Sequence, residues 1–172
     1  MSISAAPLRA AIALVLLSWA VSGVCGGDLE AKVKAAYLFH LTKFVEWPAL
    51  PGNEMHLCVV GSEEIGEMMG ELSSRQVGDK RLRIELDAVA ESAVCQILFI
   101  GRNYRRTAEL LRRARGQPVL TVGDGNDFVR QGGMVGFYME SGKVKLEVNP
   151  DNARAANLRI SAKLLEMVRL VQ

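Results

Sequence analysis

The stretch Cys95-Gln96-Ile97-Leu98-Phe99-Ile100, followed by Gly101, is a nearly continuous apolar run with a single polar side chain. This composition is typical of a strand buried on both faces, because helices cover both sides of a parallel sheet. Residues 118–122 (Pro-Val-Leu-Thr-Val) and 55–60 (Met-His-Leu-Cys-Val-Val) repeat the pattern. The three runs predict the buried central strands of a mostly parallel sheet.

Helical patterns separate and flank these strands. Asp28 is a suitable N-cap for a helix over residues 29–46, and Trp47-Pro48 ends that helix because a residue before proline avoids helical geometry. The apolar face predicted for it consists of residues spaced by three and four: Val33, Ala36, Tyr37, His40, Leu41, Phe44 and Val45. Ser62 caps a second helix with an acidic start, and a third is predicted over residues 103–114.

The remaining segments complete the fold class. Residues 81–86 alternate charged and aliphatic side chains, which predicts a half-exposed strand. Residues 134–139 and 143–148 predict an antiparallel hairpin, and residues 161–171 predict an amphipathic helix. The order predicts an α/β fold, a three-layer sandwich with a mixed, mostly parallel sheet and a C-terminal antiparallel hairpin plus helix.

The N-terminus has the layout of a secretory signal peptide. One cation, Arg9, precedes an apolar stretch over residues 10–24, which is short for a membrane span. Small residues lie at the end of this stretch: Ser22, Gly23, Gly26 and Gly27. We therefore predict a signal peptide over residues 1–26, one domain over residues 27–172 and a periplasmic location. Acylation at Cys25, as in a lipoprotein, and retention as an uncleaved anchor are the alternatives.

The charge balance excludes one class of partner. A formal net charge of +2 is too small for a nucleic-acid-binding domain, which carries a strong basic excess. The densest basic group lies on the third predicted helix: Arg102, Arg105, Arg106, Arg112, Arg113 and Arg115. This group fits a solvated helix face better than an anion or headgroup site.

Three cysteines are present, at positions 25, 58 and 95. If Cys25 leaves with the signal peptide, Cys58 and Cys95 remain, and two cysteines in an oxidising compartment are a candidate disulfide. Both lie in apolar strand-like runs, so two buried thiols that act as small hydrophobes are the alternative.

The sequence carries no recognisable motif for catalysis, cofactors or metals. It has no phosphate loop, dinucleotide-binding glycine motif or serine elbow, and neither His40 nor His56 has further zinc ligands nearby. Residues 123–127 (Gly-Asp-Gly-Asn-Asp) resemble the magnesium loop of haloacid-dehalogenase phosphatases, but they are one residue short and the nucleophile motif is missing. They fit a strand-to-helix turn better, with Asp127 as the cap of a short helix. We predict that the protein is not an enzyme and uses no cofactor or metal.

Ordered segments along the chain point to a family. The best marker is the end of the first predicted helix, residues 35–39 (Ala-Ala-Tyr-Leu-Phe) and 42–48 (Thr-Lys-Phe-Val-Glu-Trp-Pro). The other segments are residues 57–61, 95–100, 120–124, 128–135, 144–149 and 158–165. Together they resemble the YfiR-like family of exported bacterial proteins, over nearly all of the sequence after the signal peptide.

The resemblance implies a regulatory function. The best-known members are periplasmic repressors that bind the sensor domain of an inner-membrane diguanylate cyclase, which lowers cyclic di-GMP and biofilm formation. Cys58 and Cys95 match a cysteine pair of family members, and they are the candidate redox switch because a second, C-terminal pair is absent here. The candidate partner-binding residues are apolar residues of the hairpin: Phe137, Tyr138 and Met139. Exposed apolar residues of the last predicted helix are further candidates for the docking surface. A second copy of the chain and a small-molecule ligand are further candidate partners.

Two other function classes remain open. A small-molecule-binding α/β domain without catalytic activity would use the crevice at the carboxyl ends of its parallel strands, near Gly61-Ser62, Gly101 and Gly123-Asp124. An exported hydrolase would use the acidic turn at Asp124 and Asp127.

Overall fold

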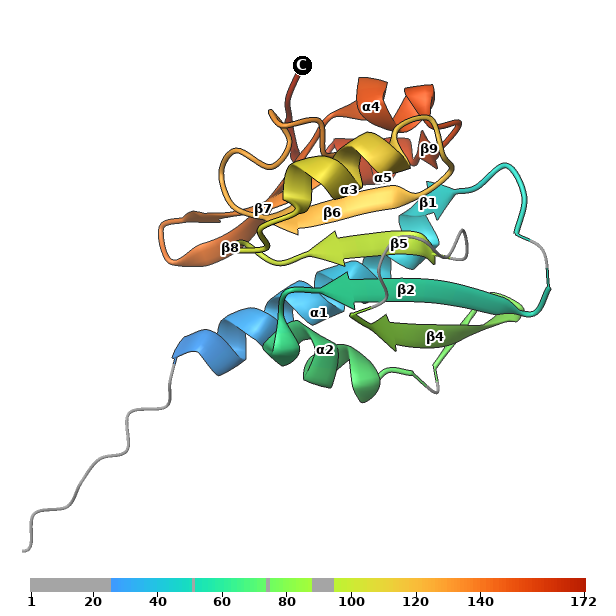
Figure 1. The fold of residues 1–172 in the computed structure, drawn as a ribbon, viewed down its shortest axis with the longest axis horizontal. Helices are drawn as coiled ribbons and strands as arrows, with labels where there is room; N and C mark the ends of the chain where they lie inside the picture. The colour runs from blue at the N-terminus through green and yellow to red at the C-terminus, as the bar shows by residue number, and fades with distance from the viewer. Residues whose placement is uncertain (1–25, 51, 74, 88–94) are drawn as a thin grey trace, which may run out of the picture.

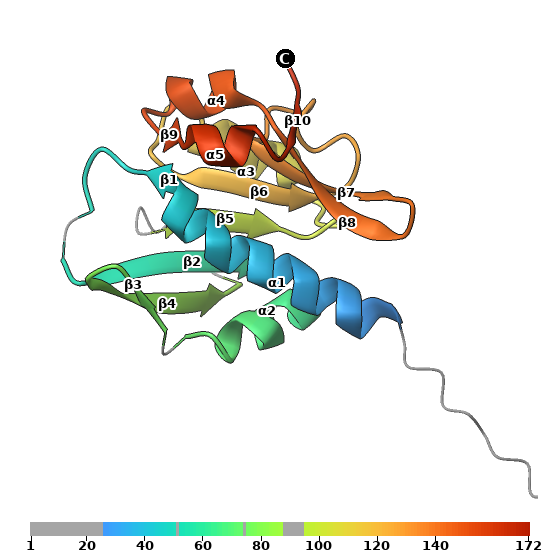
Figure 2. The same cartoon turned by 180° about the vertical axis from the view of Figure 1, so that it is seen from behind.

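The computed structural model describes residues 26–50, 52–73, 75–87 and 95–172, and Figures 1 and 2 show it from opposite sides. The predicted signal peptide and Cys25 lie outside these residues. The helices are α1 (Gly26–Phe44), α2 (Glu63–Gly70), α3 (Thr107–Ala114), α4 (Pro150–Ala155) and α5 (Ala162–Leu165). The strands are β1 (Val45–Glu46), β2 (Glu54–Val60), β3 (Gln76–Val77), β4 (Lys80–Leu86), β5 (Cys95–Ile100), β6 (Leu120–Asp124), β7 (Val135–Glu140), β8 (Lys143–Val148), β9 (Arg159–Ile160) and β10 (Arg169–Leu170).

A mixed eight-stranded sheet organises the fold, in the order β10-β8-β7-β6-β5-β2-β4-β3. The strands from β4 through β2, β5 and β6 to β7 are parallel to their neighbours. Strand β8 pairs with β7 as an antiparallel hairpin, and β3 pairs with β4 in the same antiparallel sense. The predicted mixed, mostly parallel sheet with a C-terminal hairpin is confirmed.

Helices cover both faces of the sheet, which gives the predicted three layers. Helices α1, α2 and α5 lie on one face and α3 lies on the other (Figures 1 and 2). Alternate residues of β2 therefore enter different cores: Leu57 and Val59 pack on the α1 side, while Cys58 and Val60 pack on the α3 side. Such double-sided burial explains why the central strands are continuous apolar runs.

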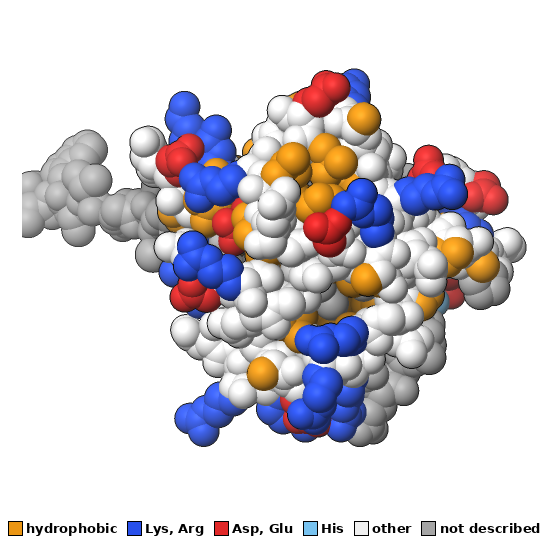
Figure 3. Space-filling view, turned by 90° about the horizontal axis from the view of Figure 1, so that it is seen from above, with side chains coloured by type: hydrophobic (Ala, Val, Ile, Leu, Met, Phe, Trp, Pro, Cys, Tyr) orange, Lys and Arg blue, Asp and Glu red, His pale blue; other side chains and the backbone are white. Residues whose placement is uncertain are grey.

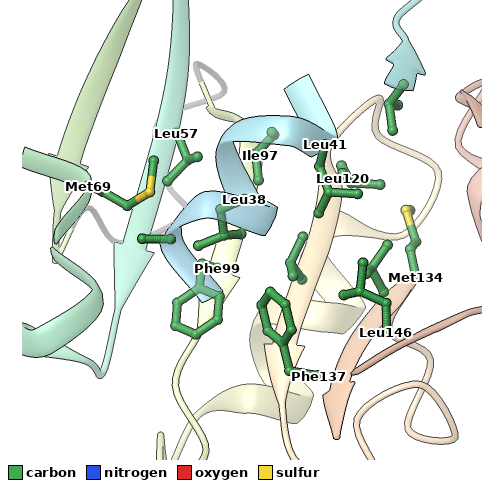
Figure 4. Close-up of a cluster of buried hydrophobic side chains, with 14 of the residues drawn as sticks. Leu38, Leu41, Leu57, Met69, Ile97, Phe99, Leu120, Met134, Phe137 and Leu146 are labelled. Carbon is green, nitrogen blue, oxygen red and sulfur yellow. The ribbon is translucent and has the colours of Figure 1, made fainter. Parts of the chain in front are cut away.

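The larger core lies between α1 and the sheet. Figure 4 shows Leu38 and Leu41 of α1 pointing onto Ile97, Phe99, Leu120 and Phe137 of the strands. All six side chains are essentially inaccessible to water. Burying a side chain of this size stabilises a fold by roughly 1.5–3 kcal/mol, so this contact is a main source of stability.

The buried face of α1 differs from the predicted one. Its most buried residues are Ala31, Lys34, Ala35, Leu38, Leu41 and Thr42. Of the predicted face, Val33, Tyr37 and Phe44 are partly buried against the core, Ala36 and His40 are exposed, and Val45 lies in β1. Two adjacent helical stripes share Leu41, and apolar spacing alone does not separate them. Asp28 is not the N-cap, because α1 begins at Gly26 and Asp28 lies inside its first turn, paired with Lys32.

Three other predicted helical segments are shorter than expected. Helix α3 begins at Thr107, because residues 101–106 form turns in which the Tyr104 amide donates to the Gly101 carbonyl. Residues 127–130 form turns instead of a short helix. The predicted helix over residues 161–171 ends at Leu165, and Arg169–Leu170 then pairs in parallel with the open edge of β8.

The connection between β6 and β7 is locked by an aromatic ring. Phe128 is 5 % exposed, and its ring lies against the backbones of Gly123 and Gly133. A Cβ atom added at Gly133 would come within 2.2 Å of the Phe128 ring, and one at Gly123 within 2.1 Å. Only residues without a side chain leave room for the ring, which accounts for both glycines.

A disulfide joins the two central strands. Cys58 of β2 and Cys95 of β5 are bonded, with their Cα atoms 5.8 Å apart. Both cysteines are buried on the α3 side of the sheet. The bond closes a loop between residues 37 positions apart, for which chain-entropy arguments allow a stabilisation of up to roughly 4 kcal/mol.

The glycine slot around Phe128 predicts a specific cost for an added methyl group. Gly133→Ala should lower the free energy of unfolding by about 1–3 kcal/mol, the usual cost of overpacking, as measured by urea unfolding. Gly70→Ala is the control, because nothing lies within 4 Å of a Cβ there. A cost of Gly133→Ala that is undiminished in a Phe128→Ala background would contradict the proposed clash.

The disulfide predicts a thermal response to reductant. With Cys25→Ser in every variant, reduction should lower the melting temperature by roughly 5–15 °C, the shift expected for a typical disulfide in a chain of this size. The Cys58→Ala/Cys95→Ala variant should melt at a lower temperature that reductant does not change. Two free thiols in the unreduced protein would rule out the bond.

Candidate functional site

The loops that follow β2, β5 and β6 meet at the carboxyl edge of the parallel strands. The chain enters the sheet at β2, adds β4 on one side and then β5, β6 and β7 on the other. Such a reversal of strand order creates a crevice where ligands of open α/β sheets bind. The structure therefore brings together Gly61-Ser62, Gly101 and Gly123-Asp124, the residues predicted for a small-molecule site.

The edge is hollowed in two neighbouring places. The first hollow, of about 530 Å³, lies between the loops after β5 and β6 and includes Arg102, Arg105, Asp124 and Asn126. The second, of about 770 Å³, lies between the loops after β2, β4 and β5 and includes Glu63, Glu64, Glu67 and Asp87. Both include Gly101, Arg102 and Asp124. The first hollow is thus lined by two arginines and two aspartates, Asp124 and Asp127, whereas the second is mainly acidic.

The loops that follow β2 and β5 pack closely against each other at this edge. A Cβ atom added to Gly101 would lie 2.0 Å from the Gly61 carbonyl oxygen, so the two loops touch through their main chains. Gly61 has a φ of +69°, which favours glycine, and a Cβ there would lie 2.9 Å from the Tyr104 ring. The Tyr104 ring therefore lies on the Gly61 backbone and fixes the start of the loop that carries Arg102 and Arg105.

A chain of charged side chains crosses the carboxyl edge. Lys34 of α1 is 5 % exposed, and its Nζ donates to Asp124 Oδ2 at 2.7 Å and to the carboxylate of Glu30. On the other side, Arg102 Nη2 donates to Asp124 Oδ1 at 3.2 Å. Asp124 thus joins α1 to the loop after β5, and both of its oxygens are engaged.

The acidic turn that suggested a hydrolase has other roles. Asp124 accepts from Lys34 and Arg102, so its carboxylate is neutralised by cations. Asp127 is exposed and pairs with Arg130 at 3.3 Å. The two carboxylates therefore act as ion-pair partners in this structure.

Among the residues that the structure describes, neither histidine belongs to a cluster that could hold a metal ion. His56 Nδ1 lies 3.3 Å from Glu85 and its Nε2 lies 3.8 Å from Glu54, at the edge of the sheet. A hydrogen bond from Arg83 lowers the pKa of the Glu54 carboxyl. The ionised Glu54 carboxylate is thus stabilised in its pair with Arg83. Among the described residues, no three His, Cys, Asp or Glu side chains are grouped so that they could hold a metal ion.

The hairpin places the three predicted partner-binding residues differently. Phe137 is fully buried and lies 6.1 Å from the Tyr37 ring and 6.2 Å from the Phe99 ring, between centroids. Tyr138 is 9 % exposed, with the Arg169 guanidinium 3.9 Å above its ring. Met139 is 42 % exposed. Of the three, only Met139 offers a large apolar surface to a partner.

The hairpin also buries a carboxyl group, Glu147 of β8, which is 7 % exposed. Gly136 makes room for it, since a Cβ there would lie 3.1 Å from Glu147 Cγ. Burial raises the pKa of Glu147 above its usual value, and the nearby Arg169 and Arg130 only partly oppose this effect. The surroundings therefore shift the protonation equilibrium of Glu147 toward its neutral form.

A family model described as YfiR/HmsC-like matches residues 31–169. The chain belongs to the YfiR/HmsC-like family. This match confirms the resemblance identified from the sequence. The family is regulatory and periplasmic, and its members act with membrane diguanylate cyclases. Among curated proteins the comparison found no match.

The matched region of this YfiR/HmsC-like chain begins in α1 and ends in β10, so it includes the carboxyl-edge hollows, the disulfide and the hairpin. None of the helices that the structure describes is long and apolar enough to cross a membrane.

Sequence reasoning missed Lys34 and Glu30. One signal was available, because Lys34 falls on the stripe of α1 that contains Ala31, Leu38 and Leu41. A lysine on a buried helical face needs a partner. That partner, Asp124, lies 90 positions further along the chain. Its pairing with Lys34 follows only from the tertiary structure.

Glu147 predicts a pH dependence with a definite sign. Because its pKa is raised in the folded protein, its contribution to stability is greatest below pH 4.5 and is lost as the pH rises through the folded-state pKa. Relative to Glu147→Gln, the wild-type protein should therefore lose stability as the pH increases from 4 to 8. Urea unfolding of both proteins across this range measures the difference, and a difference that is flat or of opposite slope would contradict the assignment.

Proposed function

We propose that this protein is an exported repressor of an inner-membrane diguanylate cyclase. It binds the periplasmic sensor domain of the cyclase and favours the inactive state, which lowers cyclic di-GMP and biofilm formation. Residues 1–26 serve as the signal peptide, and residues 27–172 form the periplasmic part. The protein acts by binding and not by catalysis.

The observation that carries this proposal is the family match over residues 31–169. Two features of the structure support it. The Cys58–Cys95 disulfide suits an oxidising compartment outside the cytoplasm. The carboxylates of the acidic turn are paired with Lys34, Arg102 and Arg130, which leaves no free acid–base pair there.

The hairpin and the C-terminal segment supply the docking surface in this proposal. Met139, Met167 and Leu170 are exposed large apolar side chains in the last third of the chain. Seen from the end that carries α3 and α4, hydrophobic side chains form a patch bordered by acidic and basic ones (Figure 3). Apolar surface with a charged border is typical of a protein-binding face.

The disulfide is the proposed redox switch. Cys58 and Cys95 join β2 to β5, the strands on either side of the crevice. Reduction removes a covalent constraint at the centre of the sheet without changing any surface residue. A repressor that is loosened in this way loses affinity for the inactive cyclase, and only such a difference in affinity between states can shift the cyclase.

A small-molecule-binding function without catalysis is the second candidate. The two hollows at the carboxyl edge favour it, since their volumes of about 530 and 770 Å³ lie in the range of small-molecule sites. A ligand there is compatible with repression.

Deletion of the gene should raise cyclic di-GMP in the source bacterium, as measured in cell extracts. Complementation with the wild-type gene should restore the original level, whereas Met139→Glu should leave it high because a charge enters the docking surface. Leu86→Glu is the matched control, since Leu86 is 59 % exposed on β4, away from the hairpin. Each exposed substitution should change stability by only about 0.5 kcal/mol, so both variants should accumulate normally.

An unchanged cyclic di-GMP level after deletion would contradict the repressor function. Full activity of Met139→Glu together with loss of activity in Leu86→Glu would move the docking surface to the opposite half of the sheet.

A further inference from the structure

We propose that the first hollow, between the loops after β5 and β6, binds a small molecule through a phosphate or carboxylate group, with Arg102 and Arg105 as its direct ligands. This inference rests on the small-molecule-binding alternative and is independent of the repressor function. It assigns a role to part of the basic group that the sequence alone placed on a solvated helix face.

The charge of the hollow favours an anion. Its carboxylates already have cationic partners, because Asp124 is paired with Lys34 at 2.7 Å and with Arg102 at 3.2 Å, and Asp127 is paired with Arg130 at 3.3 Å. Arg105 lines the hollow and makes no ion pair to a described residue. Arg102 uses one hydrogen bond on Asp124, and a guanidinium has five donors. Uncompensated positive charge and free donors therefore remain at the hollow.

A chain of ion pairs connects Arg102 to a buried lysine. Glu30 and Asp124 hold the Lys34 ammonium, whose side chain is 6 % exposed, and Asp124 in turn holds the Arg102 guanidinium. Burying such charges costs desolvation energy, so a buried ion pair is weak support for a stabilising role. The same arrangement is effective for positioning, because binding groups need supporting contacts that lock their geometry.

The remaining lining suits the polar part of a ligand. Asn126 and Gln131 offer amide groups around the two arginines, whereas the Thr107 hydroxyl already donates to the Tyr104 carbonyl at 2.7 Å. The first turn of α3 also borders the hollow, and its N-cap residue Arg106 makes no side-chain cap, although the Thr107 N–H already donates to the Tyr104 carbonyl at 3.3 Å. Bidentate hydrogen bonds from arginine match the oxygens of both phosphate and carboxylate, so the two chemistries share this site.

The test uses the purified protein and two probes, inorganic phosphate and acetate, each titrated at constant ionic strength. Chemical shifts of the backbone amides of Gly101, Thr107 and Asn126 report binding, and Val77 of β3 serves as the distant reference. We expect saturable shifts at the hollow and none at Val77 for at least one probe. Saturation by phosphate alone or by acetate alone identifies the group that binds. Non-saturable shifts with both probes would overturn the proposal.

Matched variants separate a site from general attraction. Arg102→Ala and Arg105→Ala should each weaken binding about tenfold, the loss expected for a charge-assisted hydrogen bond. Arg112→Ala removes the same charge from α3 outside the hollow and should leave the affinity unchanged. Equal weakening by Arg105→Ala and Arg112→Ala would overturn the proposal.

Asp124→Asn tests the positioning of Arg102. Removal of a negative charge beside an anion site should tighten binding if only net charge matters. If Asp124 holds Arg102 in place, the same variant should weaken binding, and this is the expected result. Thermal unfolding of the variant, followed alongside, establishes that the affinity is measured on folded protein. Tighter binding by folded Asp124→Asn would contradict the positioning role.

Discussion

Burial of both faces of β2, β5 and β6 is the constraint on which the rest of the structure depends. These strands have no side that faces water, so each needs a helical layer above and below. The α1 layer supplies Leu38 and Leu41, and the α3 layer supplies Leu110 and Leu111. Once both faces are covered, loops can reach the solvent only at the two ends of the strands. The carboxyl edge therefore becomes the place where several loops meet.

The covalent and ionic links of the protein lie around these same strands. The disulfide fixes β2 to β5 on the α3 side, and the Lys34–Asp124 pair fixes α1 to the end of β6. Phe128 fixes the next connection by filling the space beside Gly123 and Gly133. The ion pair and the Phe128 ring thus hold the carboxyl edge itself, while the disulfide joins β2 to the first residue of β5. A hollow lined by such loops keeps its shape without a ligand, which is a condition for binding a small molecule with little ordering cost.

The sequence predicted the features that depend on local pattern. The buried strands, the Ser62 cap and the hairpin follow from runs of apolar residues and from turn chemistry. The predicted stripe of α1 was right for Val33 and Tyr37, which pack partly buried against the core, and wrong for Ala36 and His40, which are exposed. The more buried stripe, which contains Ala31, Lys34 and Leu38, also has a spacing of three and four. The helix predicted over residues 161–171 was wrong beyond Leu165, since β8 offers an unpaired edge that Arg169–Leu170 occupies. Neither outcome is encoded within the segment itself.

The candidate site also combines features that follow from local sequence with features that follow only from tertiary contacts. The glycines and Asp124 at the ends of the strands could be found from the sequence, because parallel strands place their carboxyl ends on one edge. The chemical role of Asp124 could not, since Lys34 reaches it from a helix far away in sequence. From the sequence alone, Asp124 in its glycine-rich turn suggests a metal ligand or a nucleophile. Its partners in the structure suggest a different role. The two cations on its oxygens convert it into a structural and positioning group.

The hollow and the hairpin meet in one element, which gives the arrangement a regulatory logic. Asp124, at the end of β6, is the register partner of Phe137 in β7, and the Gly125 amide donates to the Phe137 carbonyl at 3.2 Å. Phe137 is packed in the main core, and Met139 follows two residues later at the surface. A rigid, fully buried residue therefore lies between the arginine-lined hollow and the exposed end of the hairpin. Interiors packed to this density transmit small displacements instead of absorbing them. A ligand that moved Asp124 would act first on the strand that carries Met139.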